Sequence, residues 1–392
     1  MPELPEVEAA RKKLEKLAQG KRIKTVHTNE DSIVFSGTTH ANFATSVEGK
    51  TVQAVRRLGK NFYLILSSPP HPIFHFGMSG MAHVRGQSSP VYRVPRSKSP
   101  DSEEWPPKYM KTWITFEGDD GETGDWAFCD PRRLGRIKLV QAEADQLEQV
   151  PPLSELGADP LLNMPLEDDL GIALARRNAP IKAVLLDQNG PFCGLGNYMV
   201  DEILYQSHIH PSHPASHLAQ PAQSALFATL HQQISTVTRT AVSVDADASR
   251  FPDTWLFQFR WGKGKKKAQG DEGFKLPDGT TSPISFITVG GRTSAVVDKV
   301  QILPPEFAGG SGRGKKRGSG DKSSDRKSSK AKGQKEEENE EDGIKKSEDY
   351  EDTSGGEIVS PHFKRKRGVK EPASPSKRPR RGAVKQDEDE DD

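Results

Sequence analysis

The spacing of apolar residues predicts one helix at the start of the chain, followed by a long series of strands. Apolar side chains recur at helical intervals through residues 5–19, at Val7, Ala10, Leu14 and Leu17, and Gly20 follows as a stop. From residue 21 to about 140 the period shortens, and Gly, Pro and Ser separate the runs. The strand-like runs are residues 21–29, 51–59, 61–67, 72–85, 111–117 and 135–140. This pattern predicts an antiparallel β-sandwich or barrel.

The second half of the chain has a different pattern. Residues 150–165 are rich in proline, as is typical of an interdomain linker, and helical patterns follow at 166–177, 180–188, 196–206 and 222–242. Two short strand-like pieces then end at Ile302, and beyond Pro304 almost no apolar residues remain, which predicts a disordered tail. We therefore expect an α+β chain with domains at 1–150, 151–245, 246–303 and 304–392. Residues 87–107 have turn composition and are expected to form a long insertion between strands.

Composition excludes several classes of protein. The chain has 392 residues, 33% of them apolar, and no apolar run approaches the ~18 residues of a membrane span. Its two cysteines argue against a disulfide framework and cannot form a four-cysteine zinc site. The net charge of +1 conceals acidic blocks at 336–342 and 387–392, which offset basic clusters elsewhere.

The second residue carries the strongest chemical signal. Removal of Met1 makes Pro2 an N-terminal secondary amine, and an unperturbed α-amino group titrates near ~8, so part of it is a free nucleophile at neutral pH. Such an amine can attack the anomeric carbon of a sugar and form an iminium, with Glu3 and Glu6 beside it for acid–base and positioning roles. The alternative is structural, since Pro5 can open a helix whose dipole favours the acidic residues of its first turn.

Six segments together resemble one known family. The opening PELPEVE (2–8) is followed in order by LGKNFYLIL (58–66), HFGMSG (75–80), DPRRLG (130–135), IKAVLLDQNGPFCGLGNYMVDEILYQSHIHP (181–211) and ITVGGRTSAVV (287–297). This series resembles the formamidopyrimidine-DNA glycosylase family of base-excision repair enzymes over residues 2–303. The resemblance implies an N-terminal β-sandwich with a leading helix, a helix–two-turns–helix domain and a DNA-contacting β-hairpin.

The resemblance implies roles for residues that spacing alone leaves ambiguous. Lys60 by itself is a solvated lysine at the start of a strand, but it aligns with the family's catalytic lysine, which contacts a phosphate and assists proton transfer. Met78, Arg132 and Leu134 align with residues that fill the hole left by a flipped base. Alone, Met78 fits a core position equally well and Arg132 a surface ion pair. Bacterial members carry an aromatic residue in place of Leu134, and an aliphatic side chain stacks less strongly.

The helical domain and the hairpin supply the remaining expected DNA contacts. Gly194 and Gly196 allow close approach of a phosphate to a helix N-terminus, where Asn197 adds a donor. Lys182 is expected to reach an adjacent phosphate or the damaged base. Arg292 follows two glycines at the tip of a hairpin that resembles the zincless finger of plant, fungal and related enzymes, so no metal or other cofactor is expected.

The sequence thus predicts a bifunctional DNA glycosylase and abasic-site lyase that acts on damaged double-stranded DNA as a monomer. Oxidised and ring-opened purines are the expected substrates, with 8-oxoguanine a weaker one, because the stretch before the hairpin does not resemble the bacterial loop that covers that base. Basic runs at 315–317, 364–367 and 377–381 predict nuclear import receptors as partners and a nuclear location. The alternatives are non-specific binding of DNA and a charge that only solubilises the tail. The competing hypotheses are a silent damage-recognition protein and a monofunctional glycosylase that activates water.

Overall fold

The computed structural model describes residues 2–87, 104–260 and 274–308. Most of the insertion expected at 87–107 and nearly all of the expected tail therefore lie outside the described residues, as do the three basic runs. The described residues all belong to one compact unit that spans 1–316.

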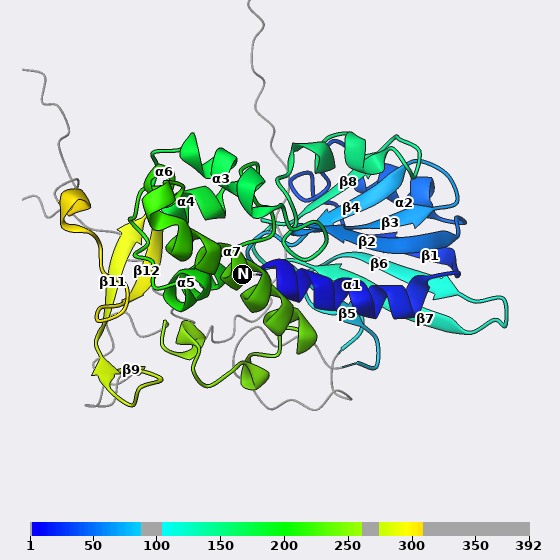
Figure 1. The fold of residues 1–392 in the computed structure, drawn as a ribbon. Coiled ribbons are helices and arrows are strands. Elements are labelled where there is room, and N and C mark those ends of the chain that lie inside the picture. Colours follow the sequence, from blue (N-terminus) through cyan, green and yellow to red (C-terminus); the bar gives the residue numbers. More distant parts are fainter. Residues whose placement is uncertain (1, 88–103, 261–273, 309–392) are drawn as a thin grey trace, which may run out of the picture. The chain divides into compact units, whose positions relative to one another are not determined.

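The N-terminal half is a β-sandwich of two antiparallel sheets, as the strand pattern predicts (Figure 1). One sheet has the order β1-β6-β7-β5, with strands Arg22–Thr28, Met110–Glu117, Thr123–Cys129 and Met81–Val84. The other has the order β2-β3-β4-β8, with strands Val52–Leu58, Asn61–Leu66, His71–His75 and Arg136–Val140. Strict alternation of buried and partly exposed residues along β6 shows why that strand forms, because one face meets the core. Aromatic rings, among them Phe62, Phe74 and Trp126, fill the space between the sheets.

Two elements of this half escaped the sequence pattern. Strand β7 begins with Thr123, Gly124 and Asp125, which obscure its alternation, although β7 lies between β6 and β5. Asp125 is satisfied within the sheet, because its carboxylate accepts hydrogen bonds from Trp113 Nε1 at 3.0 Å and Thr115 Oγ1 at 2.7 Å. The short helix α2 (His40–Val47) packs Phe43 and Val47 into the same core.

Helix α1 (Leu4–Ala18) joins the two halves of the unit. In Figure 1 it starts beside the helices and runs along the sandwich. Leu4 belongs to the apolar core of the helical part, whereas Val7 and Leu14 belong to the core of the sandwich. The start of the chain is therefore fixed at the junction of two cores.

The C-terminal half of the unit is helical and carries a β-hairpin. Its helices are α3 (Glu167–Ala175), α4 (Ile181–Leu186), α5 (Asn197–Gln206), α6 (Ala215–Leu218) and α7 (Ser224–Ser243). The hairpin pairs β11 (Ile284–Val289) with β12 (Arg292–Val297), and the short strands β9 (Phe274–Lys275) and β10 (Thr281–Ser282) precede it. Single 3₁₀ turns lie at Leu147–Gln149, Leu153–Glu155, Pro221–Gln223, Ala248–Arg250, Leu256–Gln258 and Pro305–Phe307.

The end of the described chain differs from the composition-based expectation. The tail is expected from residue 304, yet residues 304–308 are placed against the helical part. The Phe307 ring lies 5.6 Å from the His213 ring and 4.9 Å from the His217 ring, between centroids. His213 Nε2 and His217 Nδ1 are themselves 2.9 Å apart and share a hydrogen bond. Within the described helices, none is long and apolar enough to cross a membrane.

Candidate active site

The first turn of α1 gathers two buried carboxylates directly after Pro2. Pro2, Glu3 and Glu6 are all buried, and the backbone N–H of Glu3 donates to Glu6 Oε2 at 2.9 Å. Burial raises the pKa of Glu6 to about 8, and the neighbouring charge of Glu3 adds to this effect. Near neutral pH, Glu6 therefore holds a proton in a large fraction of molecules.

The Glu3 carboxylate is bound by the N-terminus of α5. Its Oε1 accepts from the Tyr198 N–H at 3.0 Å, and its Oε2 accepts from the Met199 N–H at 3.1 Å. A Cβ atom at Gly196 would lie 2.1 Å from Glu3 Cδ, so only glycine fits there. Burial raises the pKa of Glu3, while the charge of Lys60 and the two amides oppose that shift.

Lys60 approaches the same carboxylates from the sandwich. It lies in the tight turn between β2 and β3, and its Nζ donates to the Leu195 carbonyl at 2.8 Å. Burial lowers the pKa of Lys60, the positive charge of Arg292 lowers it further, and Glu3 and Glu6 raise it. The charge of Lys60 thus interacts with both carboxylates of α1 and with the arginine of the hairpin, which come from distant parts of the chain.

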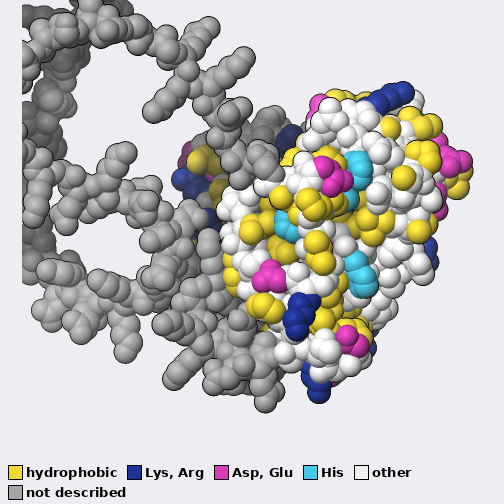
Figure 2. Space-filling view, turned by 60° about the vertical axis from the view of Figure 1, so that its left-hand side comes forward, with side chains coloured by type: hydrophobic (Ala, Val, Ile, Leu, Met, Phe, Trp, Pro, Cys, Tyr) yellow, Lys and Arg dark blue, Asp and Glu magenta, His cyan; other side chains and the backbone are white. Residues whose placement is uncertain are grey.

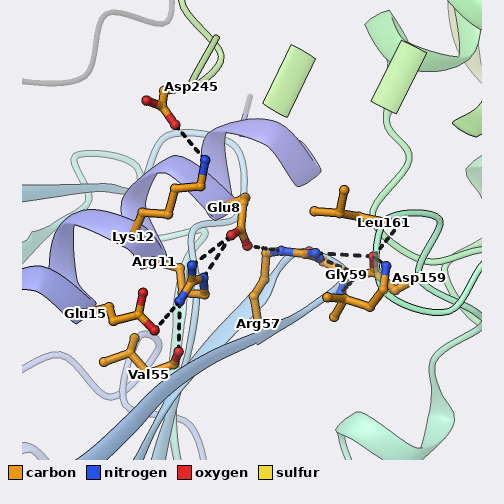
Figure 3. Close-up of polar contacts among 11 residues, drawn as sticks. Glu8, Arg11, Lys12, Glu15, Val55, Arg57, Gly59, Asp159, Leu161 and Asp245 are labelled. Carbon is orange, nitrogen blue, oxygen red and sulfur yellow. Dashed lines mark hydrogen bonds and ion pairs between the residues drawn. The ribbon is translucent and has the colours of Figure 1, made fainter. Parts of the chain in front are cut away.

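A buried ionic network fixes the turn that carries Lys60 (Figure 3). Arg57 Nε donates to Glu8 Oε2 at 2.8 Å, and the other end of the guanidinium donates to Asp159. Asp159 also accepts from the backbone N–H of Gly59 at 2.8 Å and of Leu161 at 3.0 Å. Side chains of Arg57 and Asp159 are 1% and 0% exposed, so the network is shielded from solvent. It links α1, the Lys60 turn and the proline-rich segment between the two halves.

Two loops present exposed side chains at the same end of the β2-β3-β4-β8 sheet as the Lys60 turn, because Asn61 pairs with His75 and His75 pairs with Arg136. Met78 follows β4, and Arg132 and Leu134 precede β8; all three are exposed. The loops interlock, because a Cβ at Gly77 would lie 2.3 Å from the Leu134 carbonyl oxygen. The fully buried Asp130 ties them together.

The bonds of Asp130 reach both loops. Its Oδ1 accepts from Ser79 Oγ at 2.6 Å and from the Arg132 N–H at 3.1 Å, and its Oδ2 accepts from the Gly135 N–H at 2.6 Å. Arg133 is held separately, with Nε 2.9 Å and Nη2 3.0 Å from the carboxylate of Asp31. Met78, Arg132 and Leu134 therefore stand on one braced support.

The face of the molecule in Figure 2 carries few positively charged side chains on its open part. Hydrophobic and uncharged side chains predominate among the described residues on the open part of this face, where the Lys and Arg side chains stand apart from one another. A surface that grips a nucleic-acid backbone carries its positive charges in a patch or stripe. The described residues form no such patch on the part of this face that the grey atoms leave open.

Comparison with known proteins identifies the family. The model of the formamidopyrimidine-DNA glycosylase N-terminal domain matches residues 1–137, and that of the H2TH domain of the same enzymes matches residues 156–253. A formamidopyrimidine-DNA glycosylase of Arabidopsis thaliana is 43% identical over 304 residues, which cover 77% of this chain and 71% of the relative. This chain belongs to the formamidopyrimidine-DNA glycosylase family.

Bacterial relatives and solved structures agree with this assignment. The formamidopyrimidine-DNA glycosylase of Afipia carboxidovorans is 35% identical over 257 residues, covering 64% of this chain and 82% of the relative. A mutant of the Lactococcus lactis enzyme, solved with Fapy-dG-containing DNA, matches with a TM-score of 0.59 at 25% identity, over 76% of this chain and 99% of that one. A structure of MutM with DNA containing carbocyclic 8-oxo-G has a TM-score of 0.58 at 24% identity, over 77% of this chain and 100% of that one. The two-domain fold predicted from the sequence is confirmed.

Three expectations for the helical domain need correction. Lys182 is expected from the sequence to reach DNA, but its side chain is 0% exposed, and Nζ lies 2.6 Å from Asp201 Oδ1. The anion at the N-terminus of α5 is the Glu3 carboxylate rather than a phosphate, and Gly196 makes room for that carboxylate. Asn197 is half-buried, and its Nδ2 donates to the Thr293 carbonyl at 3.0 Å.

Sequence reasoning also missed residues that brace the site, namely Glu8, Arg57, Asp130, Asp159 and Asp201. Asp130 lies inside the DPRRLG segment, where an acidic residue between two strands was a usable signal. Asp159 carries no local signal, because its main partner Arg57 is 102 residues away. Arg292 is exposed at the hairpin tip, as expected from its place after two glycines.

Proposed function

We propose that this glycosylase of the DNA-repair class is bifunctional, excising oxidised and ring-opened purines and then cutting the strand as a lyase. Removal of Met1 frees the Pro2 nitrogen, which attacks C1′ of the damaged nucleotide as the bond from C1′ to the base breaks. The base leaves with the electron pair of that bond and takes up the proton that the attacking nitrogen loses. Glu3 gives a proton to the ring oxygen of the opening sugar, and the nitrogen lone pair completes an iminium. Glu3, now a carboxylate, takes a proton from C2′, and the resulting β-elimination expels the 3′ phosphate. A δ-elimination then expels the 5′ phosphate.

One observation carries this proposal. The position that becomes the amine directly precedes a buried carboxylate that is hydrogen-bonded to a helix N-terminus, with Lys60 electrostatically coupled to that carboxylate. Glu6, protonated in a large fraction of molecules near neutral pH, accepts the Glu3 N–H and so positions the first turn. A silent binding protein has no use for two carboxylates whose burial is unfavourable when they are charged. A glycosylase that activates water leaves the amine without a role.

Two further groups of residues support a damaged duplex as the substrate. The positive charge of Arg292 lies close enough to Lys60 to lower the pKa of that lysine, and an anionic phosphate relieves this repulsion. We assign the phosphate contacts to Lys60 and Arg292. Met78, Arg132 and Leu134 are assigned to the space that a flipped base leaves. We further propose a monomer that works in the nucleus and binds import receptors through its basic tail.

Borohydride trapping tests the covalent step. A cleavable N-terminal tag whose removal leaves Pro2 as the first residue gives two preparations that differ only at the terminus. The cleaved protein is expected to form a reducible adduct with an abasic-site duplex, and peptide mapping should place the adduct on Pro2. The tagged protein should form none. Equal trapping in both preparations, or an adduct mapped to a lysine, contradicts the mechanism.

A further inference from the structure

The hairpin that carries Arg292 is fastened to the helices by a buried group of charged and polar side chains. We call this group the hairpin anchor, and it consists of Lys182 on α4, Asn197 and Asp201 on α5, and Arg260. Lys182 and Asp201 are 0% and 1% exposed. Arg260 is also largely buried, with its Nη2 2.7 Å from Asp201 Oδ2. Asp201 therefore lies between two positive charges.

The anchor converges on one backbone carbonyl, that of the residue next to Arg292. Lys182 Nζ donates to the Thr293 carbonyl at 3.1 Å, and Asn197 Nδ2 donates to the same oxygen at 3.0 Å. Two donors from two different helices thus fix the peptide bond between Thr293 and Ser294, one residue beyond Arg292. A charged donor makes the stronger kind of hydrogen bond, particularly where water is excluded.

Steric contact at the tip completes the fastening. A Cβ at Gly290 would lie 3.0 Å from Ala183 Cβ, so the turn sits closely against α4 beside Lys182. Farther along the hairpin, Ala295 and Val297 pack with Tyr205 of α5. The apolar end and the polar end of the hairpin are therefore held by the same two helices.

We propose that the hairpin anchor sets the position of Arg292, and that Lys182 and Asn197 are positioning residues that act on DNA through this arginine. The inference deepens the proposed function, since it rests on Arg292 as a phosphate contact. An exposed arginine on a loose hairpin must lose more conformational freedom on binding than one held in place. Lys182 is enclosed by protein acceptors, and it contributes to DNA affinity by restricting the conformational freedom of the hairpin that carries Arg292.

A double-mutant cycle separates this role from direct contact with DNA. The variants are Lys182→Met, Arg292→Ala and their combination, and the measurement is the affinity for a duplex with a tetrahydrofuran abasic analogue. Loss of the Arg292 contact should weaken binding by about 10- to 100-fold. Lys182→Met should cost a similar factor in the parent chain but less than about twofold in the Arg292→Ala background, because coupled residues do not add. Independent, multiplicative losses overturn the proposal.

Hydrogen exchange supplies a readout that does not depend on DNA. In Lys182→Met, exchange should accelerate at the amides of 284–297 while the sandwich strands keep their protection. Equal acceleration of exchange in the hairpin and in the sandwich strands indicates general destabilisation and contradicts a local anchor. Lys12→Met serves as control, because Lys12 pairs with Asp245 on the surface, 42% and 59% exposed, and both measurements should match the parent chain.

Two outcomes remain distinct from failure of the proposed function. If Lys182→Met does not fold, Asn197→Ala replaces it, since that change removes one bond to Thr293 and leaves the Lys182–Asp201 pair intact. Faster exchange at 284–297 with a multiplicative affinity loss rejects the coupling to Arg292. If the parent chain itself does not bind the abasic duplex, the proposed function fails, and the exchange experiment still decides whether the anchor holds the hairpin.

Discussion

Asp159→Asn is the sharpest test of how the site is held together, because it removes one charge and almost no volume. Asp159 accepts the Arg57 guanidinium and the N–H groups of Gly59 and Leu161. Asparagine keeps one carbonyl oxygen but turns an NH₂ group toward groups that are themselves donors. The buried Arg57 is then left with Glu8 as its remaining anionic partner in Figure 3.

The magnitude follows from burial. Removing one partner of a buried ion pair costs about 3–5 kcal/mol, since the remaining charge is desolvated without compensation. For a unit of this size, each kcal/mol moves the unfolding midpoint by about 1.5 °C, so Tm should fall by roughly 5–8 °C. Asp245→Asn is the matched control, because it makes the same chemical change in the exposed pair with Lys12, drawn in the same figure. Exposed pairs contribute at most about 1 kcal/mol.

Thermal unfolding followed by circular dichroism compares the two variants directly. Residue 245 has φ of 54°, a left-handed conformation that asparagine tolerates, so the control adds no backbone strain. Single-turnover excision gives a second readout, and Asp159→Asn should also slow the reaction at temperatures where it is folded, because the Gly59 N–H next to Lys60 loses its acceptor. Equal Tm shifts for the two variants refute the role of Asp159 as the counter-ion that stabilises the buried Arg57.

Three further predictions concern single side chains. Gly196→Ala should reduce the rate of excision about 100-fold, because the added Cβ displaces Glu3. Gly171→Ala in α3 is the control and should leave the rate unchanged, since its Cβ makes only ordinary contacts with Phe227. A Gly196→Ala enzyme that remains active contradicts the assigned role of Glu3. Ser79→Ala should weaken binding to an abasic-analogue duplex by roughly tenfold, the equivalent of about 1.5 kcal/mol, because the Met78 loop loses its hydrogen bond to Asp130. An unchanged affinity contradicts a role for this hydrogen bond in holding the loop for DNA binding. Burial raises the pKa of Glu202 to about 8, so the folded state keeps a proton that the unfolded state has already lost. In denaturant titrations, the wild type should therefore lose stability relative to Glu202→Gln as the pH rises from about 5 to about 9. A stability difference that does not change with pH rejects the raised pKa.

The elements with a clear period were predictable from the sequence. Helix α1 follows its apolar spacing almost residue for residue, with Val7, Ala10 and Leu14 buried. Strand β6 follows its alternation equally well. Strand β7 was not predictable in the same way, since Asp125 becomes acceptable inside a sheet only when Trp113 and Thr115 donate to it from the neighbouring strand. Periodicity contains no information about partners of that kind.

The error over Lys182 has the same origin. A lysine among the apolar residues of IKAVLL is ordinarily solvated, because burying an ammonium ion is unfavourable without a counter-ion. The counter-ion Asp201 comes from the next helix, and the second acceptor, the Thr293 carbonyl, is 111 residues away in the chain. The sequence around Lys182 shows neither of these partners. For this reason the sequence predicts an exposed residue that contacts DNA, where the structure has a buried lysine.

The opening PELPEVE is densely informative because its residues meet several different parts of the structure. Leu4 enters the helical core and Val7 the sandwich core, so the position of the first turn depends on both. Glu3 is bound by α5, Glu6 binds the first turn back to itself, and Glu8 reaches Arg57 beneath the Lys60 turn. A shift of either half relative to α1 therefore changes the geometry between the Pro2 position, Glu3 and Lys60 together. This dependence makes residues that contact no substrate, such as Asp159, matter for the chemistry as much as for stability.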